Sequence, residues 1–352
     1  MAIDVQVPAS RVFARTRPVE DTITVLFGTM LVVGVLTDAW AHVNRRSTLE
    51  SFFTPWHALL YSGFALLAAW TIFMGYRRRH DVAVWWRDAW PAGYKLGAVG
   101  VILFAVGGAG DMAWHTIFGI ESGLEVSLSP SHLLLDLGGV LVLTSPLRSW
   151  WAAGSERARA FSGVASLALA LTMASVLLMS YMPLTQAAAT KAYRAGSGSP
   201  EHLTALAGVQ GYLFATVLFV IPLLLCHRRR ATPGVATAMV GTLSLFTLAM
   251  YQFPAPQWTA LLGATLGAAL VDATLLRLDT VRGPYAPLRL PIAGGMFALC
   301  VWSGHLLGLH VAAGIAWPPE LWTGTLVMTI ALGAALGGLA TTRNQTVEVP
   351  QG

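Results

Sequence analysis

Two stretches of the chain repeat the same acidic and histidine residues in the same order. They are Asp38, His42, Glu50 and His57 in the first stretch, and Asp111, His115, Glu125 and His132 in the second. Both stretches follow the pattern D-x3-H, a short gap, then E-x3-[ST]-P-x-H, and only the gap before the glutamate differs, at seven residues against nine. Imidazole and carboxylate groups gathered in this way are typical of a transition-metal site.

The spacing within each stretch predicts where the side chains point. Asp and His four residues apart share one helix face, so Asp38 can point with His42 at one site, and Asp111 with His115. In [ST]-P-x-H the Ser or Thr is a favoured helix N-cap and proline suits the first helical position. The last histidine then falls in the first turn of the returning helix. Each helical hairpin is therefore expected to bring one aspartate and two histidines together at its turn.

Three more residues are candidates for the same site. Asp136 lies one helical turn beyond His132 and shares its face, so it is either a ligand or a carboxylate that orients that histidine. His305 and His310 lie in the outer half of a later apolar segment, about 140° apart around a helix. The structural alternative for these two histidines is a hydrogen-bonded packing role.

The ligand types limit the metal but leave alternatives open. Imidazole and carboxylate without thiolate suit copper(II), iron, zinc or manganese, and we expect copper, iron or zinc. The two stretches form either two separate triads or one shared two-metal centre. A buried hydrogen-bond network that ties helices together, or a proton or ion pathway, would use the same residue types.

The elements that must position these residues are membrane-spanning helices. Of the 352 residues, 55% are hydrophobic and 11% are charged, and the mean hydropathy is +0.62. Soluble domains carry about 25% charged residues. Ten segments are apolar over the roughly 20 residues that a membrane helix needs: 22–42, 57–76, 95–116, 132–151, 161–182, 206–226, 234–252, 257–276, 290–314 and 321–341. We therefore predict an all-α, polytopic membrane bundle whose first helix is retained rather than cleaved.

The basic residues predict the orientation of this bundle. With a cytoplasmic N-terminus, 18 of the 22 Lys and Arg residues fall on the cytoplasmic side, where such residues concentrate. Both termini are then cytoplasmic, and the acidic and histidine stretches lie near the outer surface. The basic surplus is thus a topology signal and not a nucleic-acid footprint. We divide the chain into an N-terminal segment 1–21, a four-helix unit 22–154 built of two tandem parallel hairpins, a six-helix region 155–342 and a tail 343–352.

The D-x3-H pairs with a later histidine resemble the membrane metal site in the C subunit of particulate methane and ammonia monooxygenases. In this chain the two histidines that follow each aspartate are 15 residues apart in the first stretch and 17 in the second. The resemblance covers about twenty residues per stretch. It implies that such a triad can hold a redox metal within a membrane. The ten spans, the duplication and the E-x3-[ST]-P-x-H part do not match that subunit.

Three classes of function fit these features. The first is a metal-dependent membrane oxidoreductase, similar to a monooxygenase, in which the metal activates O2 or a bound water for a small or lipophilic substrate. In that case Glu50 and Glu125 are the candidates for moving protons, although solvated loop carboxylates are the alternative. The second is a metal or small-solute transporter, which normally has a site near the bilayer midplane and inverted repeats. The third is an accessory subunit whose polar cluster docks a partner.

The sequence favours the first class, because its repeat is parallel and its site is predicted near the outer helix ends. The expected partners are the lipid bilayer and a small or lipophilic substrate, with no nucleic acid. A homo- or hetero-oligomer is left open. The absence of targeting signals leads us to expect a multi-pass protein of a bacterial plasma (inner) membrane.

Overall fold

The protein is an all-α bundle, as predicted, in a computed structural model that describes residues 14–45, 52–119, 124–196, 198–228, 232–283, 286 and 288–342. In the described part, nine helical spans are long and apolar enough to cross a membrane, and α10 is a shorter apolar helix. The elements are α1 (Pro18–Asn44), α2 (Pro55–Tyr76), α3 (Trp85–Asp88), α4 (Lys95–Phe118), α5 (Leu124–Leu128), α6 (Pro130–Leu143), α7 (Ser145–Ala152), η2 (Arg157–Arg159), α8 (Ala160–Val176), η3 (Met179–Tyr181), η4 (Ala188–Thr190), α9 (Pro200–His227), α10 (Val235–Met250), α11 (Gln257–Arg282), α12 (Arg289–Ala313) and α13 (Pro319–Thr342).

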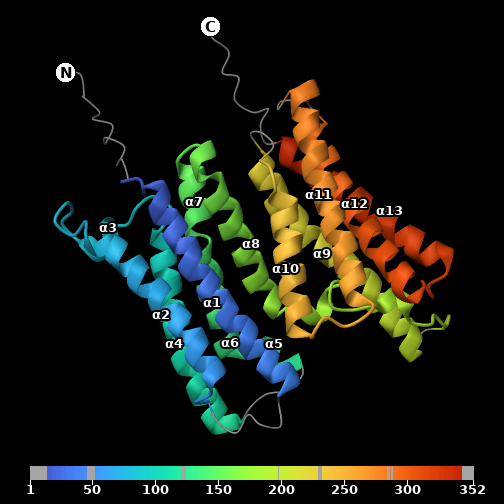
Figure 1. Cartoon of the computed structure of the whole chain (residues 1–352), viewed down its shortest axis with the longest axis horizontal. Coiled ribbons are helices and arrows are strands. Elements are labelled where there is room, and N and C mark those ends of the chain that lie inside the picture. The colour runs from blue at the N-terminus through green and yellow to red at the C-terminus, as the bar shows by residue number, and fades with distance from the viewer. Residues whose placement is uncertain are drawn as a thin grey trace, which may run out of the picture.

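The path of the chain agrees with the prediction that both termini lie on the same side of the membrane. α1 begins and α13 ends at the same end of the bundle (Figure 1). The connections at that end carry most of the described basic residues, whereas the opposite end carries Arg45, Lys191 and Arg194. The positive-inside rule predicts that the basic end faces the cytoplasm.

Two of the ten predicted spans differ from plain long helices. The fourth is broken at Thr144 into α6 and α7, because Pro146 lies in the first turn of α7 and lacks the N–H that a continuous helix would use. The seventh, α10, has 16 residues and is about 24 Å long, less than the roughly 30 Å of a hydrocarbon core. Its end is covered by protein, since the Asn44 side chain donates a hydrogen bond to the Met250 carbonyl (2.9 Å).

The two N-terminal hairpins, α1–α2 and α4–α6, cross through glycines at matching positions. Gly34 and Gly107 each lie four residues before the aspartate of their D-x3-H pair. A Cβ on Gly34 would lie 2.5 Å from the Leu60 Cα, and one on Gly107 would lie 2.9 Å from the Leu135 nitrogen. Leu60 and Leu135 each come three residues after the last histidine of their stretch. The helices of both hairpins therefore approach closely at the same register.

A second pair of glycines repeats this equivalence on the returning helices. Gly63 and Gly138 each lie six residues after the last histidine. Their added Cβ atoms would lie 2.8 Å from the Leu31 nitrogen and 2.5 Å from the Phe104 nitrogen, and Leu31 and Phe104 each precede their aspartate by seven residues. The backbone separation that places the aspartate against the last histidine is thus set by glycines in both hairpins.

This close crossing predicts the effect of a bulkier residue at Gly138. Gly138→Val is expected to force α4 and α6 apart and to lower the free energy of unfolding by about 1–3 kcal/mol. It should also weaken the binding of any ligand that residues of both helices hold. Gly110→Val in α4 is the matched control, since the nearest atom to an added Cβ there is 3.9 Å away. Thermal unfolding of both variants in detergent measures the difference. Equal stability of the two variants would contradict this account of the crossing.

The core consists of two clusters that meet at α8. One lies among the two hairpins and includes Leu169 and Met173 of α8. The other lies among α7 and α9–α13 and includes Leu167 and Leu171 of α8. The domain division near residue 155 stays a prediction. The helix that follows it, α8, packs against both core clusters.

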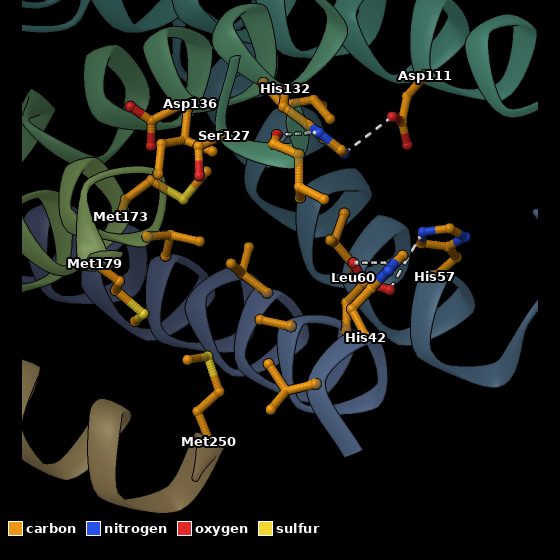
Figure 2. Close-up of a pocket in the computed structure, with 18 of the residues that line it drawn as sticks. His42, His57, Leu60, Asp111, Ser127, His132, Asp136, Met173, Met179 and Met250 are labelled. Atoms are coloured by element: carbon orange, nitrogen blue, oxygen red, sulfur yellow. Dashed lines mark hydrogen bonds and ion pairs between the residues drawn. The ribbon is translucent and has the colours of Figure 1, made fainter. Parts of the chain in front are cut away.

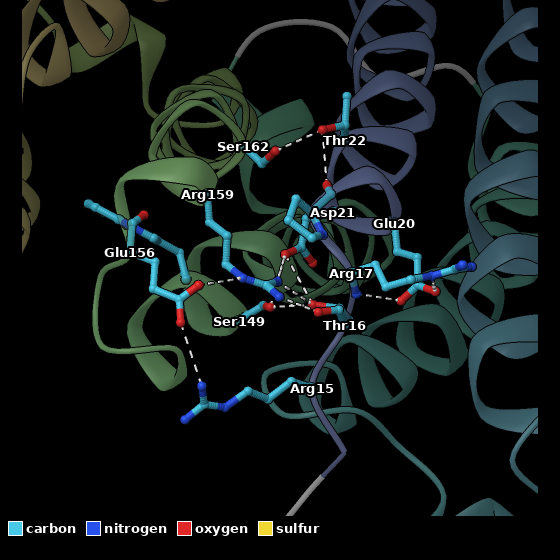
Figure 3. Close-up of polar contacts among 12 residues, drawn as sticks. Arg15, Thr16, Arg17, Glu20, Asp21, Thr22, Ser149, Glu156, Arg159 and Ser162 are labelled. Carbon is cyan, nitrogen blue, oxygen red and sulfur yellow. Dashed lines mark hydrogen bonds and ion pairs between the residues drawn. The ribbon is translucent and has the colours of Figure 1, made fainter.

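A buried ionic network lies near the start of α1 (Figure 3). Arg159 and Asp21 are 6% and 0% exposed, and the Arg159 Nη1 donates a hydrogen bond to the Asp21 Oδ2 at 2.7 Å. Tyr94 and Ser149 donate further hydrogen bonds to the same carboxylate, at 2.8 and 3.0 Å. The network joins α1, α7 and η2 at the end of the bundle opposite the acidic and histidine residues.

Candidate metal centre

Both returning helices begin as the [ST]-P-x-H pattern predicts. The Thr54 Oγ1 accepts a hydrogen bond from the backbone N–H of His57 (3.1 Å), and the Ser129 Oγ accepts one from the N–H of His132 (3.4 Å). Pro55 and Pro130 occupy the first helical positions. The predicted caps are confirmed, and each fixes its histidine in the first turn of the helix.

The first hairpin gathers Asp38, His42 and His57 into one group. One oxygen of Asp38 lies 3.2 Å from the His57 Nε2, and the other lies 3.8 Å from the His42 Nε2. One donor atom from each residue lies within 4.8 Å of the other two, which is close enough for all three to bind a single ion. Asp38 and His42 come from the last turns of α1, and His57 comes from the first turn of α2.

The second hairpin builds the same group from Asp111, His115 and His132. The Asp111 Oδ1 lies 3.4 Å from the His115 Nε2 and 3.2 Å from the His132 Nε2, again with one donor per residue within 4.8 Å. The side chains of Asp111 and His115 are 3% and 2% exposed, against 18% for both Asp38 and His42. The second triad is therefore the more buried of the two.

Backbone carbonyls determine how three of the four imidazoles present their nitrogens. The Nδ1 of His57, His115 and His132 lies within hydrogen-bond distance of a backbone carbonyl, of Phe52, Gly119 and Val126 respectively. A carbonyl only accepts, so each Nδ1 carries the proton and, in the neutral ring, each Nε2 presents a lone pair. Metal-bound histidines are usually oriented by such a bond from the other ring nitrogen.

These Nε2 atoms lie close to carboxylate oxygens, and a cation bound between the two kinds of atom would remove the repulsion between them. The Nε2 atoms of His57 and His132 lie 3.2 Å from an aspartate oxygen, and the buried Nε2 of His115 has no hydrogen-bond partner among the described residues. A lone pair facing a carboxylate is repulsive unless a proton or a metal ion lies between the two atoms. The donor set and its orientation thus fit a transition metal that accepts nitrogen and oxygen ligands.

The two triads are neighbours. The ring of His115 lies 6.3 Å, centroid to centroid, from the rings of both His42 and His57, and 6.0 Å from that of His132. His115 therefore lies between the two groups. Each triad supplies three ligands, and a tetrahedral ion would keep one position for water or substrate.

A cavity of about 550 Å³ adjoins both triads (Figure 2). Asp38, His42, His57, Asp111 and His132 line one part of it. The remaining wall is mainly apolar and comes from both hairpins and from α8, η3 and α10; it includes Val35, Leu60, Phe104, Leu135, Met173, Val176, Met179 and Met250. Cavities of this size bind small ligands in other proteins.

The structure places the other predicted site residues apart from the triads. Asp136 lines the same cavity but belongs to neither metal-binding group. His305 is buried in the second core cluster, where its Nδ1 is hydrogen-bonded to the Tyr212 hydroxyl (2.8 Å), and His310 is exposed in the last turn of α12. These two positions fit packing and surface roles. Glu50 lies outside the described residues, and for Glu125 only its place in the short helix α5 is described.

Some residues of this site escaped the sequence analysis. Tyr61 lines the cavity, with its ring 6.1 Å from that of His57, and follows that histidine by one helical turn. The signal was available, since Tyr61 and Asp136 occupy the same position relative to His57 and His132. No sequence signal could have assigned Met173, Met179 and Met250 to the cavity, because tertiary packing alone brings them there.

His202 shows what the [ST]-P-x-H pattern alone specifies. The sequence Ser199-Pro200-Glu201-His202 begins α9, and the Ser199 Oγ accepts a hydrogen bond from the His202 N–H (3.1 Å), as in the two hairpins. His202 nevertheless belongs to neither metal-binding group. The pattern thus marks a helix start, and only the two copies preceded by a D-x3-H pair belong to groups that could hold a metal ion.

No protein-family model, curated protein or solved structure matches this chain. The geometry of the two triads and their shared cavity is therefore what indicates the function of this protein.

Proposed function

We propose that the protein is a metal-dependent membrane oxidoreductase that acts on a small or lipophilic substrate near the outer membrane face. The observation that carries the proposal is the shared cavity: two Asp-His-His triads line one part of it, and apolar side chains form most of the rest. A metal site built only for stability is usually closed by four protein ligands. Here each triad has three, beside a space that a ligand can enter.

The protein's own residues would divide the work as follows. His57, His115 and His132 are held by backbone carbonyls and present their Nε2 atoms, while Asp38 and Asp111 supply negative charge. Copper or iron bound there would supply redox chemistry, and zinc would supply a Lewis acid. The apolar wall would exclude water and bind the apolar part of the substrate.

The position of the site supports an enzyme over a transporter. The triads lie at the ends of α1 and α4 and at the starts of α2 and α6. Transport sites usually lie near the bilayer midplane, where discontinuous helices meet. The resemblance to the monooxygenase C subunit is consistent with this proposal and adds a redox metal as the first candidate.

The test uses the full chain in lipid nanodiscs, loaded in turn with copper, iron and zinc. We expect product formation from small apolar substrates, supplied with O2 and a quinol as electron donor, with copper or iron and not with zinc. The His57→Ala/His132→Ala variant should lose this turnover, and His202→Ala should keep it. A chain that retains copper or iron but forms no product, and instead moves metal across liposomes, would overturn the oxidoreductase proposal.

A further inference from the structure

One carboxyl in the cavity has no role in the two triads. Among the described residues that line the cavity, Asp136 is the only acidic one besides Asp38 and Asp111. It extends from α6 one helical turn after His132. Figure 2 shows it beside Met173, on the side of His132 away from Asp111.

One oxygen of this carboxyl also lacks a partner among the described residues. The Asp136 Oδ1 is buried and has no hydrogen-bond partner, and no described residue forms an ion pair with Asp136. A buried polar group without a hydrogen bond costs free energy, and an ionisable residue inside a membrane domain is usually functional. A hydrogen-bond donor on a bound ligand would satisfy this carboxylate oxygen.

The surroundings of Asp136 limit what that ligand can be. Apart from the triads, Asp136, Tyr61, Ser127 and Tyr251, the described residues of the cavity wall are apolar, and Met173 beside Asp136 is one of them. At about 30 Å³ per water-sized group, the cavity of about 550 Å³ holds on the order of 15 to 20 non-hydrogen atoms. A molecule that fits is therefore small and mostly apolar, with one group that can donate a hydrogen bond.

We infer that Asp136 anchors the substrate by accepting a hydrogen bond from its single hydroxyl or amine group, while the apolar part of the molecule lies in the cavity beside the triads. This inference rests on the proposed function, because it takes the cavity to be the substrate site. Asp136 is thus a binding residue for substrate and not a metal ligand. The equivalent position in the first hairpin holds Tyr61, so the two hairpins contribute different polar groups to the cavity.

The test is photolabelling of the full chain in nanodiscs with three diazirine probes of equal length: a medium-chain alcohol, its amine and its alkane. We expect the alcohol or the amine to label peptides of α6 and α8 about tenfold more than the alkane, as one hydrogen bond to a buried acceptor would give. Asp136→Leu should reduce that labelling to the alkane level. Glu320→Leu, which changes an exposed carboxylate outside the cavity lining, should leave it unchanged.

Two further readouts separate binding from other roles. Asp136→Asn keeps an acceptor oxygen without a charge, so it should retain labelling by an alcohol and lose labelling by an amine. Asp136→Leu should unfold at the same or a higher temperature than wild type, because an unpaired polar group is removed, whereas a structural role would lower that temperature. Labelling that is equal for the three probes, or unchanged in Asp136→Leu, would overturn the inference.

The same labelling on chain freed of metal by chelator distinguishes this inference from the proposed function. Labelling that depends on Asp136 in a chain that never retains metal would support the anchor and contradict the metalloenzyme. A chain that retains metal and turns over substrate, but labels independently of Asp136, would contradict the anchor alone.

Discussion

His57→Ala combined with His132→Ala is expected to remove the tightly bound metal from the protein. Each substitution deletes one imidazole from a triad that has only three ligands, and the Asp-His pair left behind offers two donors. Loss of a residue that only orients a ligand already weakens metal binding by about 10–100-fold, so loss of a ligand from both triads should exceed that range. Elemental analysis of the purified variant and of the wild type, both prepared without chelator, measures the loss.

His202→Ala is the matched control for that variant. His202 occupies the same place in a helix, with the same serine and proline before it, but belongs to neither triad. It should leave the metal content at the wild-type level. Retention of wild-type metal by the double variant would contradict the assignment of these ligands.

Arg159→Met is expected to destabilise the bundle by about 3–5 kcal/mol, the usual cost of removing one partner from a buried ion pair. The substitution would leave the Asp21 carboxylate buried, 0% exposed, with hydrogen bonds from neutral groups but without its cation. It would also remove the hydrogen bond from Arg159 to the Thr16 hydroxyl (2.8 Å), which ties the segment before α1 to η2. The unfolding temperature in detergent should fall accordingly.

Two variants test whether the loss arises from this ion pair. Arg157→Met changes an exposed arginine two residues away and should have little effect. Asp21→Asn, added to Arg159→Met, removes the uncompensated charge and should restore part of the stability, which a double-mutant cycle quantifies. Equal unfolding temperatures for Arg159→Met and Arg157→Met would show that the network does not stabilise the bundle.

The sequence was sufficient to predict the class of fold and which aspartates and histidines come together in each triad. The helix spacing of Asp38 and His42 and the cap before His57 are local features, and local features are read directly from residue order. The prediction that each triad lies at the turn of its hairpin follows from the same features. A further sign of the repeat is four glycines at matching positions in the two stretches, Gly34, Gly63, Gly107 and Gly138. A pattern defined only by acidic residues and histidines does not include them.

The remainder depends on contacts between distant parts of the chain. Packing between the hairpins and α8–α10 determines that α10 ends at Met250. The same packing brings Met173 and Met179 to the cavity wall. The separation of His305 from the triads has the same origin, because α12 packs on α9, α11 and α13. Amphipathic periodicity cannot assign helix neighbours in a membrane domain, where nearly every helix face is apolar.

X-ray absorption at the edge of the metal retained by the full chain tests the central claim most directly. The cavity offers two different sets of donors: the imidazoles and carboxylates of the triads, and the thioethers of Met173, Met179 and Met250. Metal in the triads predicts a nitrogen and oxygen shell at about 2.0–2.2 Å with outer scattering from imidazole rings. A sulfur shell at about 2.3 Å, or protein that retains no metal after loading, would contradict the account.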